Sequence, residues 1–90
     1  MLKIHKSSLF EKDIKSLIKK HYKFDKLFIV IELLKNNEKL PNKYRNHYLQ
    51  NDWQGYQECH IEKDLLLIYQ IEDNILYLER LSNHRDLFGI

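Results

Sequence analysis

Residues 57–81 read QECHIEKDLLLIYQIEDNILYLERL, and their hydrophobic pattern predicts consecutive β-strands. Apolar and polar residues alternate as the stretch begins, which is typical of a strand with one buried face. A nearly continuous apolar run follows, and a cluster of turn-forming residues separates it from a last apolar run. The stretch therefore predicts an antiparallel meander. We place its strands at residues 55–61, 64–71 and 75–81, joined by residues 62–63 and by a hairpin turn at residues 72–74.

The residues before this meander predict a short strand at residues 2–5 and then a helix. Ser8 and Glu11 have the spacing of a capping box, which marks a helix start, and we expect this helix to end near Tyr22. Its apolar side chains recur at helical spacing, at Phe10, Ile14, Leu17 and Ile18.

A second helix is predicted from Asp25, which can cap its first turn, to Asn36. The segment at residues 28–31 is also β-prone, but the length of the run favours a helix. Residues 39–54 have no clean period and predict a long ordered loop. The apolar stripe of the second helix is Leu27, Val30, Ile31 and Leu34.

This order of elements, β-α-α-β-β-β, is typical of a two-layer α+β domain in which an antiparallel sheet packs against a helical pair. Ninety residues are enough for one core, and 43% hydrophobic with 31% charged residues fit a folded chain. We therefore expect residues 1–90 to form a single domain.

Composition argues against secreted and membrane proteins. Cys59 is the only cysteine, so no internal disulfide can form, and this favours a reducing, cytoplasmic location. The longest apolar runs, residues 27–31 and 65–69, are too short to cross a bilayer. The first residues lack the apolar segment of a secretory signal, so we expect no membrane association.

Charge is distributed unevenly, although the formal net charge is only +2. Residues 1–26 carry eight lysines against three carboxylates, whereas residues 51–90 carry three cations against eight carboxylates. A lysine-rich helix is often simply a solvated face, but it can also bind a polyanion. Charge alone leaves both interpretations open.

Ionisable rings gather in the second half of the chain. His47, His60 and His84 lie there, and Asp64 follows His60 by four residues. In an antiparallel meander these strand ends can meet at one rim, and the loop that carries His47 can fold over it. Arg80, four residues before His84, adds a cation. The pattern predicts a polar site at one rim of the sheet.

Three interpretations of this set are open: ordinary polar residues at a sheet edge, a metal site, or metal-free acid–base catalysis. The spacing lacks a close-set ligand motif and a cysteine pair, so we expect no metal and no cofactor. Imidazole titrates near neutral pH, so one histidine can act as a base and another as an acid.

Cleavage of RNA needs the groups that this set supplies. The ribose 2′-OH loses a proton as it attacks phosphorus, the phosphorane gathers negative charge, and the leaving 5′-oxygen gains a proton. Arg80 could stabilise the phosphorane through two parallel hydrogen bonds. Phe88, in a short tail beside His84, could stack an unpaired base.

The segments around these residues resemble the YafQ branch of the RelE-like bacterial toxins. Their order and spacing agree, so the resemblance covers essentially the whole chain. Leu65 departs from it, because some relatives have tryptophan there. The segments that carry the resemblance are Asn46-His47-Tyr48-Leu49-Gln50, Trp53-Gln54-Gly55-Tyr56, Glu58-Cys59-His60, Asp64 with residues 68–69, Glu79-Arg80-Leu81, and His84 with Leu87-Phe88-Gly89.

The resemblance implies a fold, an activity and partners. The fold is a RelE-like toxin domain spanning residues 1–90. The activity is ribosome-dependent, metal-free endoribonuclease cleavage of mRNA in the A site. The partners are the ribosome with its 16S rRNA, the mRNA, and the cognate antitoxin of a type II toxin–antitoxin pair.

It also implies site residues, because His47, His60, Asp64, His84 and Phe88 fall on the family's active-site positions. We expect His84 to be the acid and Asp64 the base, while His47 and His60 orient the substrate and offset charge. His60 would serve nearly as well as the base. Arg80 matches a basic position beside them.

The lysines of the first helix are the expected rRNA-docking surface. Two other functions stay open: a ParE-like toxin that binds a topoisomerase without cleaving RNA, and an inactive interaction protein. The histidine set argues against the first, and in the second the histidines would be relics. The docking lysines are Lys12, Lys15, Lys19, Lys20 and Lys23.

Overall fold

The structure is a computed structural model that describes residues 1–89. It is built around a five-stranded sheet within those residues. The elements in chain order are β1 (Lys3–Lys6), α1 (Ser8–Lys19), α2 (Asp25–Lys35), the 3₁₀ turn η1 (Asn42–Tyr44), β2 (His47–Tyr48), the 3₁₀ turn η2 (Asn51–Trp53), β3 (Gln57–Glu62), β4 (Leu65–Glu72), β5 (Ile75–Ser82) and α3 (His84–Phe88).

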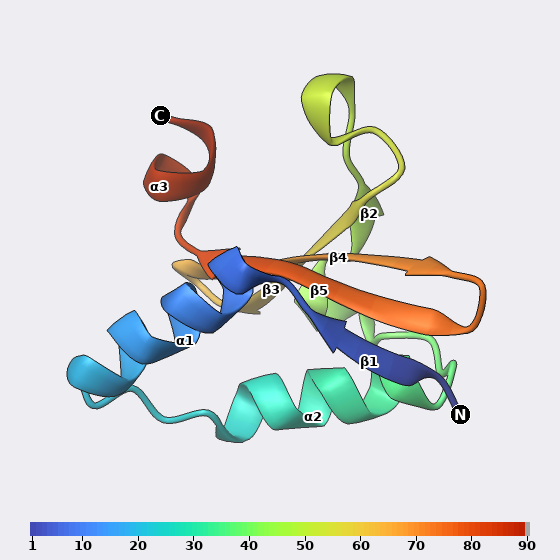
Figure 1. Cartoon of the computed structure of the whole chain (residues 1–90), viewed down its shortest axis with the longest axis horizontal. Coiled ribbons are helices and arrows are strands. Elements are labelled where there is room, and N and C mark those ends of the chain that lie inside the picture. Colours follow the sequence, from blue (N-terminus) through green and yellow to red (C-terminus); the bar gives the residue numbers. More distant parts are fainter. Residues whose placement is uncertain (90) are drawn as a thin grey trace.

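The predicted two-layer α+β architecture is confirmed (Figure 1). The strand order is β1-β5-β4-β3-β2, and β3, β4 and β5 form the expected antiparallel meander. Asp73 and Asn74 join β4 to β5 with positive φ at both residues (53° and 64°), which is the requirement of a tight type I′ turn.

The sheet is mixed rather than purely antiparallel, because β1 runs parallel to β5. The strand β1 therefore lies along the edge of β5, and α1 begins two residues after β1 ends. Ser7 fixes the junction, since its N–H donates to the carbonyl of Leu78 and its hydroxyl donates to that of Glu79. The start of α1 thus lies beside the second half of β5, next to Arg80.

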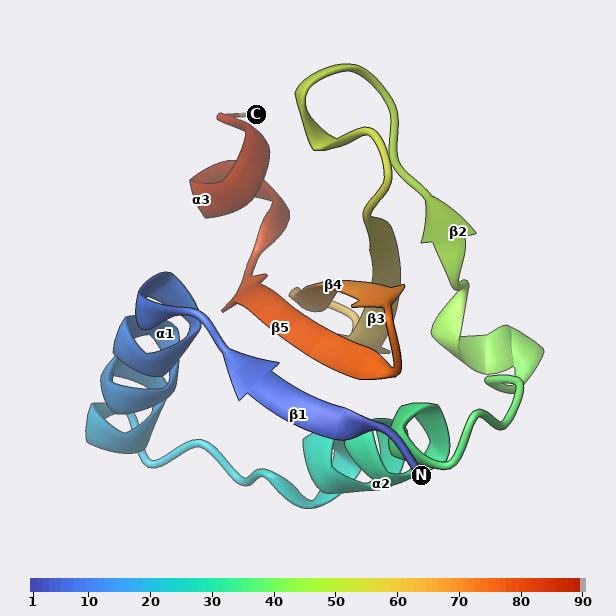
Figure 2. The same cartoon turned by 45° about the vertical axis from the view of Figure 1, so that its right-hand side comes forward.

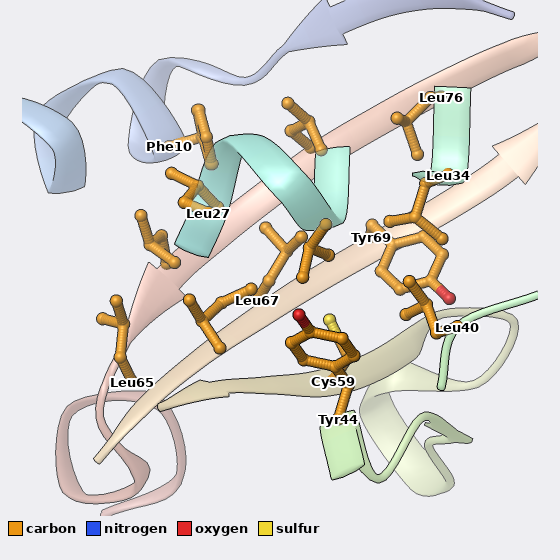
Figure 3. Close-up of a cluster of buried hydrophobic side chains, with 14 of the residues drawn as sticks. Phe10, Leu27, Leu34, Leu40, Tyr44, Cys59, Leu65, Leu67, Tyr69 and Leu76 are labelled. Atoms are coloured by element: carbon orange, nitrogen blue, oxygen red, sulfur yellow. The ribbon is translucent and has the colours of Figure 1, made fainter. Parts of the chain in front are cut away.

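The core fills the space between the sheet and the helices α1 and α2. Leu27 and Leu34 of α2 point toward Leu67 and Tyr69 of β4 (Figure 3). All four are less than 5% exposed, and burying a side chain of this size contributes roughly 1.5–3 kcal/mol. Cys59 of β3 completes this face. The opposite face of the sheet lies between α3 and the β2–β3 loop, which both project from it (Figures 1 and 2).

The helix ends differ from the predictions at three points. Ser7 rather than Ser8 caps α1, because Ser7 is extended and its hydroxyl accepts from the N–H of Phe10 at 3.0 Å. Asp25 is the first helical residue of α2 and not its cap, and the capping position, Phe24, makes no side-chain bond. The helix α1 also ends at Lys19, since the chain turns at His21 with a φ of 60°.

The strand ends also differ. The strand β3 continues to Glu62, so that Asp64 lies in the turn before β4 and not on a strand. Two β-bulges interrupt the ladders, at Ile61 in β3 and at Glu79 in β5. The predicted loop at residues 39–54 holds η1, β2 and η2, and the predicted tail forms α3. Within residues 1–89, no helix is long and apolar enough to cross a membrane.

Candidate active site

A buried carboxylate lies between two of the predicted histidines. Glu58 is 2% exposed, and its Oε1 atom is 3.5 Å from Nε2 of His47 and 3.4 Å from Nε2 of His60. The centres of the two imidazole rings are 6.5 Å apart. The structure therefore brings His47 and His60 together through a single carboxylate oxygen.

Strand pairing explains this arrangement. His47 in β2 is directly opposite Glu58 in β3, and paired residues of antiparallel strands project to the same face. His60 follows Glu58 by two residues and so shares that face, while Cys59 between them packs into the core. The bulge at Ile61 follows immediately, and bulges commonly re-aim a neighbouring side chain beside a functional site.

The second ring nitrogen of His47 has its own partner. Nδ1 lies 2.9 Å from the carbonyl oxygen of Arg45, and a carbonyl only accepts, so Nδ1 carries the hydrogen and donates. Arg45 ends η1 in the left-handed region with a φ of 49°, a conformation that is unfavourable for arginine. This contact orients the ring so that Nε2 of His47 faces Glu58.

Arg80 lies in the same lateral row of the sheet and is held by α1. Its pairing partner in β4 is Ile68, which in turn pairs with Glu58. Nε and Nη2 of Arg80 donate to the two carboxylate oxygens of Asp13, at 2.9 and 3.1 Å. This hydrogen bonding raises the pKa of Arg80, so the guanidinium is a permanent cation.

Arg80 and Asp64 line the same cleft, of about 750 Å³, between α1 and the β3–β4 turn. His60 lines a second cleft, of about 620 Å³, on the other side of the end of β3. Lys63 borders both clefts. The predicted residues therefore form two neighbouring groups: the histidine pair on Glu58, and Asp64 with the Arg80–Asp13 pair.

The remaining predicted residues belong to α3. Asn83 caps this helix, since its side chain accepts from the N–H of Asp86 at 2.8 Å. His84 is the first helical residue, and Phe88, which is partly buried, is the last. The side chain of His84 lies outside what the structure describes, so its role stays a prediction. Its backbone position is defined, because Ser82, two residues earlier, pairs with Leu66 of β4. Leu66 pairs on its other side with His60, so Ser82 and His60 lie in one row across the sheet.

Two residues of the site were not among the sequence predictions: Glu58 and Asp13. Glu58 had a signal, because alternation placed it on the same strand face as His60. No sequence signal indicated Asp13, because its contact with Arg80 joins α1 to a bulged part of β5 and produces no sequence pattern. The predicted docking lysines are all exposed, but Lys20 caps the end of α1 and Lys23 lies beyond the helix.

Comparisons with known proteins place the chain in a family. Residues 2–89 match the profile of the bacterial toxin of type II toxin–antitoxin systems, YafQ. The chain is 42% identical over 87 residues to the mRNA interferase toxin YafQ of Escherichia coli BL21-DE3, covering 96% of this chain and 95% of that protein.

Solved structures agree with that match. The DinJ–YafQ complex of E. coli contains a chain with a TM-score of 0.90 and 41% identity, covering 99% of this chain and 100% of that one. A copper-bound mutant toxin from Helicobacter pylori has a TM-score of 0.94 and 35% identity, covering 98% and 100%.

The fold and the family match together define a toxin of a type II toxin–antitoxin system. The chain belongs to the YafQ family, and its class of enzyme is that of the mRNA interferases, which are endoribonucleases.

Proposed function

We propose that this toxin acts in the cytoplasm and cleaves mRNA in the ribosomal A site without a metal ion, by attack of a ribose 2′-OH on the adjacent phosphorus. The single observation that carries this proposal is the buried Glu58 carboxylate, which holds the Nε2 atoms of His47 and His60 within 3.5 Å. Two imidazoles on one carboxylate form a proton-transfer group of the kind that general acid–base catalysis uses.

The base of the first step is His60 or Asp64. The contact with Glu58 favours His60, because a carboxylate that orients an imidazole also stabilises the imidazolium formed when the ring takes the 2′-OH proton. Asp64 lies in the turn just beyond, in the cleft with Arg80, and is the second candidate. His47 shares Glu58 and would offset charge on the phosphorane.

The acid of the second step is His84, which would donate a proton to the leaving 5′-oxygen. Arg80 would stabilise the phosphorane: a guanidinium has five N–H donors, and the contacts with Asp13 engage two of its nitrogens. Phe88 at the end of α3 would stack an unpaired base of the message.

Docking on the ribosome would use the exposed lysines of α1 and the segment after it, which can bind the phosphates of 16S rRNA. One of these lysines, Lys20, also lines the cleft that holds Asp64 and Arg80, so docking through α1 would bring this cleft next to the ribosome. The residues are Lys12, Lys15, Lys19, Lys20 and Lys23.

Inhibition would come from a cognate antitoxin, as the E. coli relative forms a complex with DinJ. A second surface suits such a protein partner. An apolar groove of about 720 Å³ runs between α1, α2 and β1, and Phe28 and Ile18 on its sides are 64% and 56% exposed. Exposed aromatic and aliphatic side chains of this size are typical of a protein-binding surface.

The proposal is tested by incubating the pure protein with ribosomes translating a defined message and mapping the new RNA ends. We expect codon-phased cuts that leave a 2′,3′-cyclic phosphate, and that persist when a chelator selective for transition metals is added at constant Mg²⁺. His84→Ala should abolish them, and His60→Ala should slow them more than Asp64→Asn if His60 is the base. An intact message together with binding to a topoisomerase would instead support the ParE-like function.

A further inference from the structure

We propose that the cleft beside His60 is a phosphate-binding subsite, which holds the mRNA backbone at a linkage next to the cut. This inference rests on the proposed function and adds the path of the substrate to it. The cleft lies between α2, η1 and the end of β3, with a volume of about 620 Å³. Its cationic side chains are Lys26, Lys43, Arg45 and Lys63.

The charge of this cleft distinguishes it from its neighbour. Among the described residues, four cations line it against one carboxylate, Glu62. The cleft that holds Arg80 has four cations and four carboxylates. A chain of phosphates is attracted more strongly to the first cleft than to the second, where Arg80 would contact the scissile phosphate alone, because binding a polyanion depends on the excess of positive charge.

The one carboxylate in the cleft is already compensated. Glu62 accepts a hydrogen bond from the hydroxyl of Tyr22, and Lys26 lies 3.1 Å from its Oε1 atom. These contacts lower the pKa of Glu62, so it stays ionised and keeps Lys26 beside it. Lys43, Arg45 and Lys63 are then the cations that face a ligand.

Two of these cations are positioned by the fold. The Nζ atom of Lys43 lies 5.2 Å from the ring centre of Tyr44, which is 6% exposed and anchored in the core. Arg45 comes next, in the left-handed conformation that also directs its carbonyl to His47. The same turn therefore positions a cationic side chain for phosphate binding and orients the imidazole ring of His47.

The strand pairing leaves this side of β3 open. The edge strand β2 pairs with β3 at Gln57 and Glu58, so within residues 1–89 the end of β3 lies at the edge of the sheet. A single-stranded backbone can approach the cleft along this edge. The ligand class is a phosphodiester of extended RNA, with the cations contacting phosphate oxygens and the bases left for the α3 side.

Cleavage kinetics with altered substrates test the subsite. Toxin in excess is mixed with ribosomes programmed with three messages: a normal one, and two that carry an uncharged methylphosphonate at the linkage just 5′ or just 3′ of the cut. The main variant is Lys43→Gln with Arg45→Asn, since asparagine retains the left-handed backbone. Lys63→Gln, in the β3–β4 turn, is a second variant that leaves η1 unchanged. Lys3→Gln with Lys39→Gln is the matched control for charge.

We expect the main variant to raise the half-saturating toxin concentration about tenfold on the normal message, the loss typical of a charged hydrogen bond. Wild type should lose a similar factor on one methylphosphonate message, and the variant should lose nothing further there. The control should match wild type on all three. The subsite would be overturned if the variant raised the half-saturating concentration by the same factor over wild type on all three messages. Weaker binding of the variant to ribosomes without mRNA would also overturn it, in favour of an rRNA contact. Failure of wild type to cut the normal message would instead overturn the proposed function, and the subsite with it.

Discussion

Asp13 of α1 binds Arg80 of β5 with both carboxylate oxygens, and one of those oxygens also accepts the backbone N–H of Leu81 at 2.9 Å. The contact is made next to the bulge at Glu79. It therefore joins the helix layer to the strand that carries the guanidinium. Arg80 owes its orientation to a residue 67 positions earlier in the chain.

The first prediction concerns this pair. Asp13→Asn keeps the size of the side chain but removes the charge that holds Arg80, so we expect about 1–3 kcal/mol of destabilisation in urea unfolding and a cleavage rate at least tenfold lower. In an Arg80→Ala background, Asp13→Asn should lower the rate little further, because the two residues act through one contact. Asp25→Asn, exposed at the start of α2, is the control. Additive losses of rate would show that Asp13 acts independently of Arg80.

The second prediction concerns the carboxylate between the histidines. Glu58→Gln preserves volume and hydrogen-bonding length but removes the charge that orients two imidazoles, so we expect the cleavage step to slow by about 10²-fold. Ribosome binding should be unchanged. Glu38→Gln, on an exposed loop, is the matched control. A rate equal to wild type would exclude proton transfer through the histidine pair.

The third prediction concerns the support of β2. The hydroxyl of Tyr69 donates to Oδ1 of Asn46 at 2.6 Å and lies 3.1 Å from Oε1 of Gln57, which fixes the residue before His47 to the sheet. Tyr69→Phe should cost about 1 kcal/mol in chemical unfolding, because the hydrogen bond that ties the buried Tyr69 to Asn46 is lost. Tyr77→Phe, on β5, should have a smaller effect. Equal unfolding midpoints for the two variants would contradict this role of the hydroxyl.

The fourth prediction concerns alkaline pH. Burial raises the pKa of the Cys59 thiol to about 12, and burial also raises the pKa of Tyr69. Both groups stay protonated in the folded state but ionise in the unfolded chain. Stability is therefore fully present below the unfolded thiol pKa, near 8.5, and falls as pH rises toward the folded value.

Urea midpoints measured from neutral pH to about pH 11 check this trend. Cys59→Ala should delay the onset of the fall until the tyrosines begin to ionise, near pH 10. The comparison concerns the pH dependence, since the substitution also leaves a small cavity. An unchanged onset would mean that the thiol is not the group that titrates first.

The fifth prediction concerns ribosome docking. Changing Lys12, Lys15 and Lys19 to Glu should abolish cleavage on ribosomes, because three attractive contacts with phosphates become repulsive. The exposed positions of these lysines predict a normal unfolding midpoint. Normal cleavage by this variant would refute docking through α1. Changing Lys3, Lys35 and Lys39 to Glu alters the net charge by the same amount and provides the control.

The meander and both helices could be predicted from sequence, because hydrophobic periodicity and turn-forming residues depend only on neighbouring positions in the chain. The apolar run within residues 64–71 predicted a buried strand, and residues 65–69 are buried on both faces. Asp73 with Asn74 tolerates the left-handed turn that joins β4 to β5. The partner of β1 could not be predicted, since a four-residue strand with alternating polarity fits either sheet edge and either direction. The cap of α1 was wrong by one residue for a similar reason: Ser7 and Ser8 are both competent, and contacts with β5 select Ser7.

The candidate site could be predicted only in outline. Residue type identified His47 and His60, and the structure brings them together. The two bulges that adjust β3 and β5 depend on packing across the sheet, so the sequence did not indicate how His60 and Arg80 are aimed. The expectation that Asp64 opens a strand was wrong, because β3 continues to Glu62 and the turn moves with it.

The position of β5 between β1 and β4 has a consequence for synthesis of the chain. The first strand can find its neighbour only after the last strand has left the ribosomal exit tunnel, because β1 pairs with Ile75 and the residues that follow it. Arg80 and the start of α3 are synthesised after the other strands of the sheet. The sheet that positions the candidate site therefore closes only after most of the chain has been synthesised, because its central pairing joins the first strand to the last one.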